Sequence, residues 1–308
     1  MKKLIIGTRG SNLALNQAMD VRKKILFYNP NIDVIVKIIK TEGDIDQKTP
    51  IRNIPDKGFY TKEIERSLID SSIDIAVHSM KDLPLALESE FEIGAVLKRK
   101  SPMDVILTNK YSEITDLPDK GIVAVGSLRR SLQLKKIFPL IQTVDIRGNI
   151  ETRIKKMIDN NWDGLIMAKA AIERLSIKEN FHEFKINEMV PAPCQGIVAI
   201  EVLKNQSKLR PILKAINDSK TFEISRIERI IAKKLDGGCK IPVGCLVSIE
   251  DNAISINAYI SNDAGSLFIN ESVSANIDKY NTESLAEILV TKMVSKGLKN
   301  ILNQRLNN

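Results

Sequence analysis

The chain has 308 residues, which is long enough for two or three domains of roughly 100–150 residues each. Its 43% of hydrophobic residues and its mixture of both charges exclude an intrinsically disordered protein. No apolar run approaches the roughly 18 residues of a membrane-spanning helix, and the run after Met1-Lys2-Lys3 is too short for a signal peptide. We therefore expect a cytoplasmic protein that has no membrane partner.

The net charge of +8 admits a nucleic acid, a membrane surface or an anionic small molecule as the partner. Nucleic acid is disfavoured because aromatic residues, which stack on bases, make up only 5% of the chain and the basic residues do not form one stripe. The cysteines, Cys194, Cys239 and Cys245, are too few for a disulfide framework. With so few histidines and no C-x-x-C motif, the sequence predicts no metal site.

The N-terminal part of the chain alternates between strand and helix patterns. Apolar runs predict strands at residues 3–8, 34–39 and 73–77 and a helix at about 61–71. Ser11 is placed to cap another helix, whose apolar face continues to Ile25. This order predicts a mainly parallel sheet. Residues 41–58 contain glycine and proline without apolar periodicity, so we expect a long loop there.

The pattern restarts after Ser101-Pro102 and changes again near residue 218. Between these points, strands are predicted at 104–107, 122–125, 142–146 and 164–168, and helices at 129–137, 149–160 and 169–175. Beyond them, we expect a helix at 222–235, strands at 245–250, 253–260 and 267–274, and one closing helix at about 283–302. The predicted fold class is therefore α/β, with two α/β domains plus a smaller C-terminal α+β domain.

Arginine recurs where predicted strands end, the edge at which open α/β sheets bind ligands. It does so at Arg9, at Arg129 and Arg130, at Arg147 with Arg153 in the following helix, and at Arg174. Two arginines at a helix start oppose the helix dipole, so a bound anion is expected to offset them. Taken singly, each arginine is also compatible with a surface residue. Because guanidinium groups pair with carboxylates in a planar fork, the recurrence favours a polycarboxylate ligand.

Lys81 and Asp82 follow directly after an apolar strand, in the segment His78-Ser79-Met80-Lys81-Asp82-Leu83-Pro84. Pro84 prevents a simple continuation into a helix, so the pair should lie in a shaped loop. Two interpretations remain open. The pair is either a solvated surface pair or a site carboxylate kept ionised by the adjacent cation.

The segment from Leu235 to Cys245 places Cys239 beside Gly237 and Gly238. Because glycine has no Cβ, these two residues permit a turn that holds the thiol out on a loop. One interpretation is an attachment point or a reactive thiol. The other is a small buried cysteine at a strand edge.

These segments, taken together, resemble the porphobilinogen deaminase family, whose members are also called hydroxymethylbilane synthases. The His-Ser-Met-Lys-Asp and Gly-Gly-Cys motifs are together highly specific. The matching segments occur in the family's order between residues 4 and 245: Thr8-Arg9-Gly10-Ser11-Asn12-Leu13-Ala14-Leu15, Thr41-Glu42-Gly43-Asp44, residues 78–84, Ser127-Leu128-Arg129-Arg130, Arg147-Gly148-Asn149 with Arg153, Pro191-Ala192-Pro193-Cys194-Gln195-Gly196, and Leu235-Asp236-Gly237-Gly238-Cys239.

The resemblance implies a transferase of tetrapyrrole (haem) biosynthesis. Such an enzyme joins four porphobilinogen molecules head to tail and releases ammonia each time, to form hydroxymethylbilane. The resemblance also implies a dipyrromethane cofactor, itself two porphobilinogen units, held by a thioether to Cys239. The cofactor primes the chain and stays on the enzyme. A monomer with porphobilinogen as its partner is implied as well.

The family's functional residues carry over onto this sequence position by position. Asp82 is implied as the catalytic acid–base group, where accepting hydrogen bonds from pyrrole N–H groups would stabilise the cation left when ammonia departs. The arginines would neutralise the acetate and propionate groups of the pyrroles. The implied cofactor-binding residues are Cys239, Lys81, Asp82, Ser127, Arg129, Arg130, Lys57 and Tyr60. The implied substrate-binding residues are Arg9, Ser11, Arg147, Gly148, Asn149, Arg153, Arg174 and Gln195.

The family fold implies three domains, the first two similar to periplasmic binding proteins with a cleft between them. The implied boundaries are residues 1–98 with 195–217, residues 102–192, and residues 219–308, the last carrying the cysteine loop. Residues 41–58 would be a mobile cover over the cleft. The sequence departs from the family at Tyr60, where phenylalanine is usual, at Cys194, where glycine is usual, and at Cys245, where serine is frequent. These departures leave the expected activity intact.

Two other classes of function compete with the enzyme. A two-lobed protein that binds an anionic small molecule without catalysis would account for the α/β lobes and the arginines, but not for Cys239 on its glycine loop. A nucleic-acid-binding protein is suggested by the charge alone, and steeply salt-dependent binding would support it.

Overall fold

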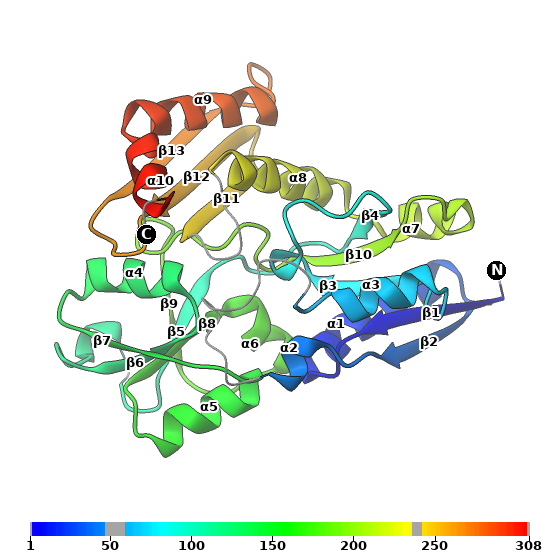
Figure 1. The fold of residues 1–308 in the computed structure, drawn as a ribbon, viewed down its shortest axis with the longest axis horizontal. Coiled ribbons are helices and arrows are strands. Elements are labelled where there is room, and N and C mark those ends of the chain that lie inside the picture. The colour runs from blue at the N-terminus through cyan, green and yellow to red at the C-terminus, as the bar shows by residue number, and fades with distance from the viewer. Residues whose placement is uncertain (1, 47–58, 112, 236–241, 307–308) are drawn as a thin grey trace. The chain divides into compact units, whose positions relative to one another are not determined.

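The computed structural model describes residues 2–46, 59–111, 113–235 and 242–306 (Figure 1). The chain forms two compact units, each built from segments that are far apart in the sequence. The first unit comprises Met1–Ser101, Ala170–Ile177 and Gly196–Glu223, and the second comprises Pro102–Lys169, Lys178–Gln195 and Ile224–Asn308. Each unit is described by itself below.

The first unit contains a five-stranded sheet of order β2-β1-β3-β10-β4. Strand β1 runs parallel to β2 and β3, whereas β10 runs antiparallel to both of its neighbours, β3 and β4. Four of the five strands therefore run in one direction, as expected for a mainly parallel sheet, and β10, which arrives from a distant part of the chain, is the strand that runs against them. The strands are β1 (Lys3–Thr8), β2 (Asp33–Ile38), β3 (Ile75–Ser79), β4 (Phe91–Val96) and β10 (Val198–Leu203).

Helices cover both faces of this sheet. Helix α1 (Asn12–Tyr28) begins as predicted at Ser11, whose hydroxyl accepts the amide hydrogen of Ala14, and it buries Ala18, Val21 and Ile25 against one face. Helix α7 (Arg210–Ile216) shares that face, while α3 (Lys62–Ile69) packs Ile64 and Leu68 on the other. Residues expected to be loop at 42–45 instead form the short helix α2 (Glu42–Ile45), and residues 47–58 lie outside the described part of the chain.

The second unit contains another five-stranded sheet, of order β7-β6-β8-β5-β9. Strand β6 runs parallel to β7 and β8, and β5 runs antiparallel to β8 and β9. The two large sheets thus share one pattern of strand directions, although the antiparallel strand comes last in the chain in the first sheet, as β10, and first in the second, as β5. The elements are β5 (Asp104–Leu107), β6 (Ile122–Val125), α4 (Leu128–Ile137), β7 (Gln142–Asp145), α5 (Ile150–Asp159), β8 (Gly164–Ala168), α6 (Lys169–Leu175, which continues into the first unit) and β9 (Phe181–Glu183).

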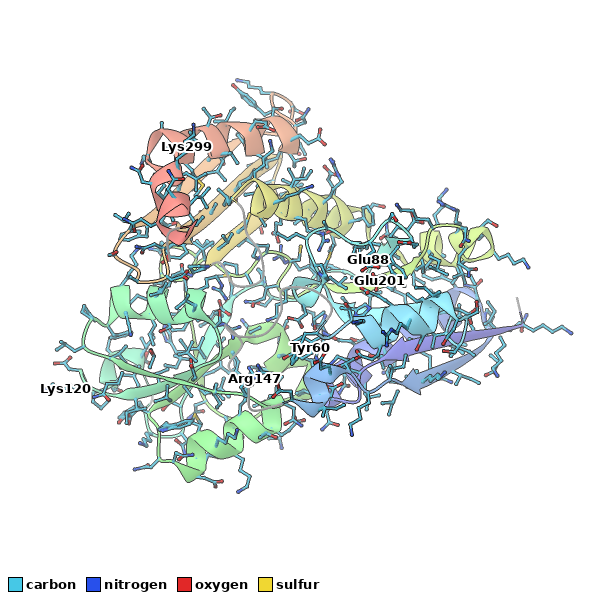
Figure 2. The ribbon with its side chains drawn as sticks, in the orientation of Figure 1. Tyr60, Glu88, Lys120, Arg147, Glu201 and Lys299 are labelled. Atoms are coloured by element: carbon cyan, nitrogen blue, oxygen red, sulfur yellow. The ribbon has the colours of Figure 1, made fainter. Side chains whose placement is uncertain are left out.

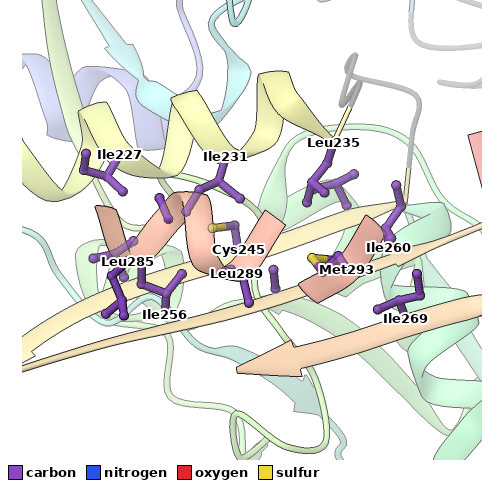
Figure 3. Packing of buried hydrophobic residues seen from close by; sticks show 14 of the residues in the cluster. Ile227, Ile231, Leu235, Cys245, Ile256, Ile260, Ile269, Leu285, Leu289 and Met293 are labelled. Atoms are coloured by element: carbon purple, nitrogen blue, oxygen red, sulfur yellow. The ribbon is translucent and has the colours of Figure 1, made fainter. Parts of the chain in front are cut away.

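The C-terminal part of the second unit is built around a three-stranded antiparallel sheet, β11-β12-β13. Figure 3 shows the apolar cluster on one face of this sheet, to which Ile227 and Ile231 of α8 and Leu289 of α9 contribute. One closing helix was expected, but Gly297, with φ of +95°, separates two. The elements are α8 (Ser219–Lys234), β11 (Val243–Glu250), β12 (Ala253–Ser261), β13 (Phe268–Asn276), α9 (Thr282–Ser295) and α10 (Leu298–Leu306).

These three sheets confirm the predicted fold class, two α/β parts and a smaller α+β part. The boundaries of three domains, at residues 98, 102, 192, 195, 217 and 219, stay a prediction. In the part of the chain that the structure describes, no helix is both long enough and apolar enough to cross a membrane.

Candidate active site

Arg9 lies in the turn between β1 and α1 of the first unit, where it is held by a carboxylate and a ring. Its guanidinium group donates to Oδ1 of Asp44, at 3.0 Å from Nε, and lies 4.3 Å from the centre of the Tyr60 ring labelled in Figure 2. Burial opposes ionisation of Asp44, but the hydrogen bond and charge of Arg9, together with bonds from Thr41, hold the pKa of this carboxyl below its usual value. The guanidinium group of Arg9 therefore has a fixed orientation.

Lys81 and Asp82 lie on a single 3₁₀ turn, Met80–Asp82, directly after β3. The turn is held in place because Met80 is buried and its N–H donates to the carbonyl of Ile197 at 3.0 Å. The hydroxyl of Ser79 is bonded to the side-chain amide of Gln17 at 2.8 Å. Asp82 itself is exposed. The turn held by these contacts thus presents an exposed carboxylate, with Lys81 as the preceding residue.

The strand behind this turn is tied to β10 by a buried pair. Nε2 of His78 lies 3.1 Å from Oε2 of Glu201, and both side chains are buried. Glu201 is labelled in Figure 2. This contact lies at the start of the His-Ser-Met-Lys-Asp motif and joins β3 to its neighbour in the sheet, β10.

Arg174 of α6 also belongs to the first unit, and its side chain is only 4% exposed. One Nη donates to the carbonyl of Gly196 at 3.2 Å, while Nε lies 3.9 Å from the carboxylate of Asp20 and has no hydrogen-bond partner among the described residues. Burial lowers the pKa of Arg174, against the opposing charges of Asp20 and Glu173. A buried guanidinium N–H without an acceptor is suited to an anionic ligand.

In the second unit, Asp104 of β5 gathers three of the predicted site residues. Its fully buried carboxylate accepts from Nε of Arg130 at 2.9 Å and from Nε2 of Gln195 at 2.8 Å, and Nη1 of Arg129 lies 2.9 Å away. Burial disfavours the charge of Asp104, but the two arginines outweigh it and lower its pKa to about 2. Sequence analysis missed this residue. The one signal for it is an acid at the start of an apolar strand.

The sequence predicted that a bound anion offsets the two arginines at the start of α4. In the structure, the carboxylate of Asp104 is an anion of the protein itself that pairs with both of them. Arg129 also donates to the carbonyl of Val190 at 2.7 Å, and burial lowers its pKa. Two guanidinium groups share this one carboxylate, so the cluster keeps an excess positive charge. Ser127 occupies the N-cap position of α4, yet its side chain makes no capping hydrogen bond. The serine hydroxyl therefore plays no part in starting the helix.

The turn before α5 holds Arg147, Gly148, Asn149 and Arg153. Asn149 caps the helix by accepting the amide hydrogen of Thr152 at 2.8 Å. Gly148 has φ of +117°, which strains any residue with a Cβ, and its carbonyl accepts from Nε of Arg153 at 2.8 Å. The guanidinium group of Arg153 thereby reaches Gly126. If Gly126 were replaced by a residue with a Cβ, that atom would lie 3.4 Å from Nη1 of Arg153. Gly148 and Asn149 thus shape the turn and hold Arg153.

The Pro191–Gly196 segment has left-handed backbone at two positions, one of which is Cys194. Cys194 is buried with φ of +61°, the left-handed region that favours glycine, which is the residue usual in the family at this position. Gly196 has φ of +87°, and a Cβ there would lie 2.5 Å from the carbonyl of Lys100. Both positions therefore favour glycine, although this chain has it at only one.

Two predicted site residues, Cys239 and Lys57, lie outside the described residues. Ser11, Arg9, Tyr60, Lys81, Asp82 and Arg174 belong to the first unit, whereas Ser127, Arg129, Arg130, Arg147, Gly148, Asn149, Arg153 and Gln195 belong to the second. The predicted residues are thus divided between the two units, and in the second unit Arg129, Arg130 and Gln195 meet at the carboxylate of Asp104.

Family models match almost the whole chain. Residues 4–211 match the dipyrromethane cofactor-binding domain of porphobilinogen deaminase, and residues 222–295 match the C-terminal domain of that enzyme. The chain belongs to the porphobilinogen deaminase family. The porphobilinogen deaminase of Syntrophomonas wolfei is 41% identical over 85% of this chain and 86% of its own length. That of Ruthia magnifica is 35% identical over 98% of this chain and 99% of its own.

Solved structures that align with this chain are distant in sequence. The methionine-binding protein MetQ aligns with 77% of this chain and 96% of its own, at 12% identity and a TM-score of 0.46. An amino-acid transporter's extracellular binding protein from Bacillus subtilis, ytmK, gives a TM-score of 0.42 at 12% identity, over 76% of this chain and 97% of its own.

Membership of the family confirms the predicted function class. The chain is an enzyme, a transferase of tetrapyrrole biosynthesis with hydroxymethylbilane synthesis as its activity and dipyrromethane as its cofactor. The alternative, a binding protein without catalysis, is not favoured.

Proposed function

We propose that this chain joins four porphobilinogen molecules with Asp82 as its acid–base group and with its cofactor held by a thioether to Cys239. The observation that carries the proposal is the pinned Met80–Asp82 turn, which presents an exposed carboxylate beside the Lys81 ammonium group. A carboxylate presented in this way can accept a hydrogen bond from a pyrrole N–H group.

The cationic side chains fit a group that carries several carboxylates. Arg129 and Arg130 keep an excess positive charge beside Asp104, and Lys81 adds an ammonium group in the first unit. These residues, with Ser127, Lys57 and Tyr60, would hold the cofactor, whose terminal pyrrole supplies the carbon nucleophile. A nucleophile of that kind makes a serine, histidine and aspartate triad unnecessary.

We assign the incoming substrate's acetate and propionate groups to a second set of cations. Arg174 offers a buried N–H without an acceptor among the described residues, and the Asp44 carboxylate fixes the direction of Arg9. Such preorganised donors lose little freedom when they bind a carboxylate. The other members of the set are Ser11, Arg147, Gly148, Asn149, Arg153 and Gln195.

The role of Asp82 is to hold and move a proton at the reacting ring. When ammonia leaves, positive charge spreads onto the ring nitrogen, and the carboxylate of Asp82 stabilises it by accepting the N–H hydrogen bond. The same carboxylate can take up the proton lost when the new carbon–carbon bond has formed. Arginine neutralises the substrate's own carboxylates and leaves Asp82 as the negative group at the reacting centre.

We further propose that the enzyme works as a monomer in the cytoplasm, as its family resemblance implies. Sedimentation of the active protein at micromolar concentration is expected to give the mass of a single chain, 34.5 kDa plus cofactor. A dimer as the active species would contradict this.

The attachment at Cys239 is tested by the intact mass of the purified protein. We expect an excess over the polypeptide mass that equals two linked pyrrole units, and we expect Cys239→Ser to lack it, because a serine hydroxyl is a far poorer nucleophile than a thiolate. Cys245→Ser is the matched control and should retain the excess, since Cys245 is buried in the apolar cluster. An unchanged mass excess in Cys239→Ser would refute the attachment site.

A further inference from the structure

Gln133 of α4 is a buried amide that holds a backbone segment in place. Its side chain is 2% exposed and lies one helical turn after Arg129. The N–H of Val190 donates to Oε1 of Gln133 at 2.9 Å, and Nε2 of Gln133 donates to the carbonyl oxygen of Val190 at 3.1 Å. All three residues belong to the second unit. Gln133 therefore fixes where the carbonyl group of Val190 lies.

The same carbonyl group orients Arg129. Nη1 of Arg129 donates to the carbonyl oxygen of Val190 at 2.7 Å and lies 2.9 Å from Oδ2 of Asp104. In the described part of the chain, both of these contacts of the guanidinium group are made by one nitrogen. The N–H groups of Nε and Nη2 form the edge opposite Nη1, and such an edge can take a carboxylate with two parallel hydrogen bonds. The direction in which that edge faces depends on where the Val190 carbonyl lies.

Arg130, the next residue in α4, is held differently. Its Nε donates to Oδ1 of Asp104 at 2.9 Å, and its Nη2 lies 2.8 Å from the same oxygen. Its Nη1 donates to the carbonyl of Ile166 at 3.4 Å. All three nitrogens of Arg130 thus contact groups of the protein. Arg129, held at a single nitrogen among the described residues, is therefore the arginine of this pair that a carboxylate ligand can engage with two bonds.

We propose that Gln133 is a positioning residue for cofactor binding, because it fixes the Val190 carbonyl group that orients Arg129 toward a carboxylate of the cofactor. The inference rests on the proposed function, in which Arg129 helps to hold the cofactor. Gln133 does not touch the cofactor and acts through Arg129. Its effect is large because a guanidinium group turned out of the bidentate geometry loses one or both of its hydrogen bonds to a carboxylate.

The test uses full-length protein made in cells that cannot produce porphobilinogen. Porphobilinogen is then added, and the gain of two pyrrole units is followed by intact mass. Gln133→Met keeps the length of the side chain but removes both hydrogen bonds to Val190. We expect the folded variant to gain this mass about tenfold more slowly than wild type, since a misplaced binding group slows a reaction that depends on orientation.

A double variant distinguishes positioning from a general loss of structure. Arg129→Lys removes the planar fork itself and should also load about tenfold more slowly than wild type. If Gln133 acts through Arg129, adding Gln133→Met to Arg129→Lys should slow loading by less than about twofold further. A general distortion of α4 would slow the double variant much more, because Arg130 would be displaced as well.

Asn217→Leu is the matched control for the loss of a buried hydrogen bond. Oδ1 of Asn217 accepts the N–H of Val96 at 2.9 Å in the first unit, so this substitution also leaves a backbone N–H without its amide partner. It should lower the free energy of unfolding and yet load at the wild-type rate.

The outcomes separate the two proposals. If the wild-type protein gains no mass, the proposed cofactor fails and this inference fails with it. If Arg129→Lys loads like wild type, Arg129 does not hold the cofactor, and that part of the proposed function is refuted together with the inference.

If wild type loads and Arg129→Lys is slow, the proposed function stands, and Gln133 is tested alone. Folded Gln133→Met that loads at the wild-type rate, or that slows the Arg129→Lys background in full, refutes the positioning role. Should Gln133→Met fail to fold, folded Gln133→Asn decides in the same manner, because its amide is one methylene too short to reach both backbone groups of Val190.

Discussion

Asp82→Asn is expected to lower kcat about a thousandfold, since it removes both a proton acceptor and the negative charge that stabilises the cationic ring. The substitution keeps the size of the side chain. The turn around it is held by backbone and Ser79 contacts, and Asp82 is exposed, so the free energy of unfolding should change by less than about 0.5 kcal/mol. Release of ammonia at saturating porphobilinogen, with chemical denaturation in parallel, measures both quantities.

The control for Asp82→Asn is Asp119→Asn, which removes the same charge from an exposed position. It should leave kcat unchanged. A kcat for Asp82→Asn within about tenfold of wild type would mean that another group carries the proton, because positioned acid–base groups usually contribute more than that.

Asp104→Asn should produce the largest loss of stability among single substitutions at the site. Its carboxylate is fully buried between Arg129 and Arg130, and an amide would leave two buried guanidinium groups without their counter-ion. Breaking buried pairs of this kind costs about 3–5 kcal/mol. Glu183→Gln, which breaks the partly exposed pair with Lys169, is the matched control and should cost less than about 1 kcal/mol.

The contribution of Asp104 to the free energy of unfolding depends on pH, and the lowered pKa of its carboxyl group determines the direction of the change. The pKa is lowered from 3.8 to about 2 in the folded protein, so ionised Asp104 stabilises the fold fully above about pH 4. This contribution, about 2 kcal/mol, is lost as the pH falls from about 4 towards 2. Urea denaturation at pH 6, 4 and 3 should therefore show the difference between wild type and Asp104→Asn shrinking at the lowest pH. A difference that stays constant or grows would contradict the assigned ionisation.

Local patterns predicted the elements that depend on local chemistry. Strands at 104–107 and 122–125 and the helix capped by Ser11 are confirmed, since apolar periodicity and capping act within a few residues. Strand β10 was not predicted, because its partners β3 and β4 are more than a hundred residues away in the sequence and its direction is decided by them. The break at Gly297 was missed although the glycine is visible, because apolar residues continue on both sides of it.

The site residues were predicted from motifs and from the recurrence of arginine. The carboxylates that hold these residues in place were not predicted. Nothing local marks Asp104 as the counter-ion of Arg129 and Arg130, because this pairing exists only once β5 and α4 have packed. Gln133 is hidden for the same reason: a glutamine in a helix is normally solvated, and its burial against Val190 depends on the tertiary fold. Sequence therefore predicts groups that act on ligands more readily than groups that hold them.

The place of β10 in the first sheet has a consequence for how the chain folds while it is synthesised. All strands of the second large sheet have left the ribosome once Glu183 has emerged, whereas the first sheet still lacks β10 until Leu203 has emerged. The sheet that starts first is thus completed last, and in the interval β3 and β4 each present an open edge. Unpaired edges associate with other chains, so nascent chains stalled between these two points should be the species that most needs a chaperone.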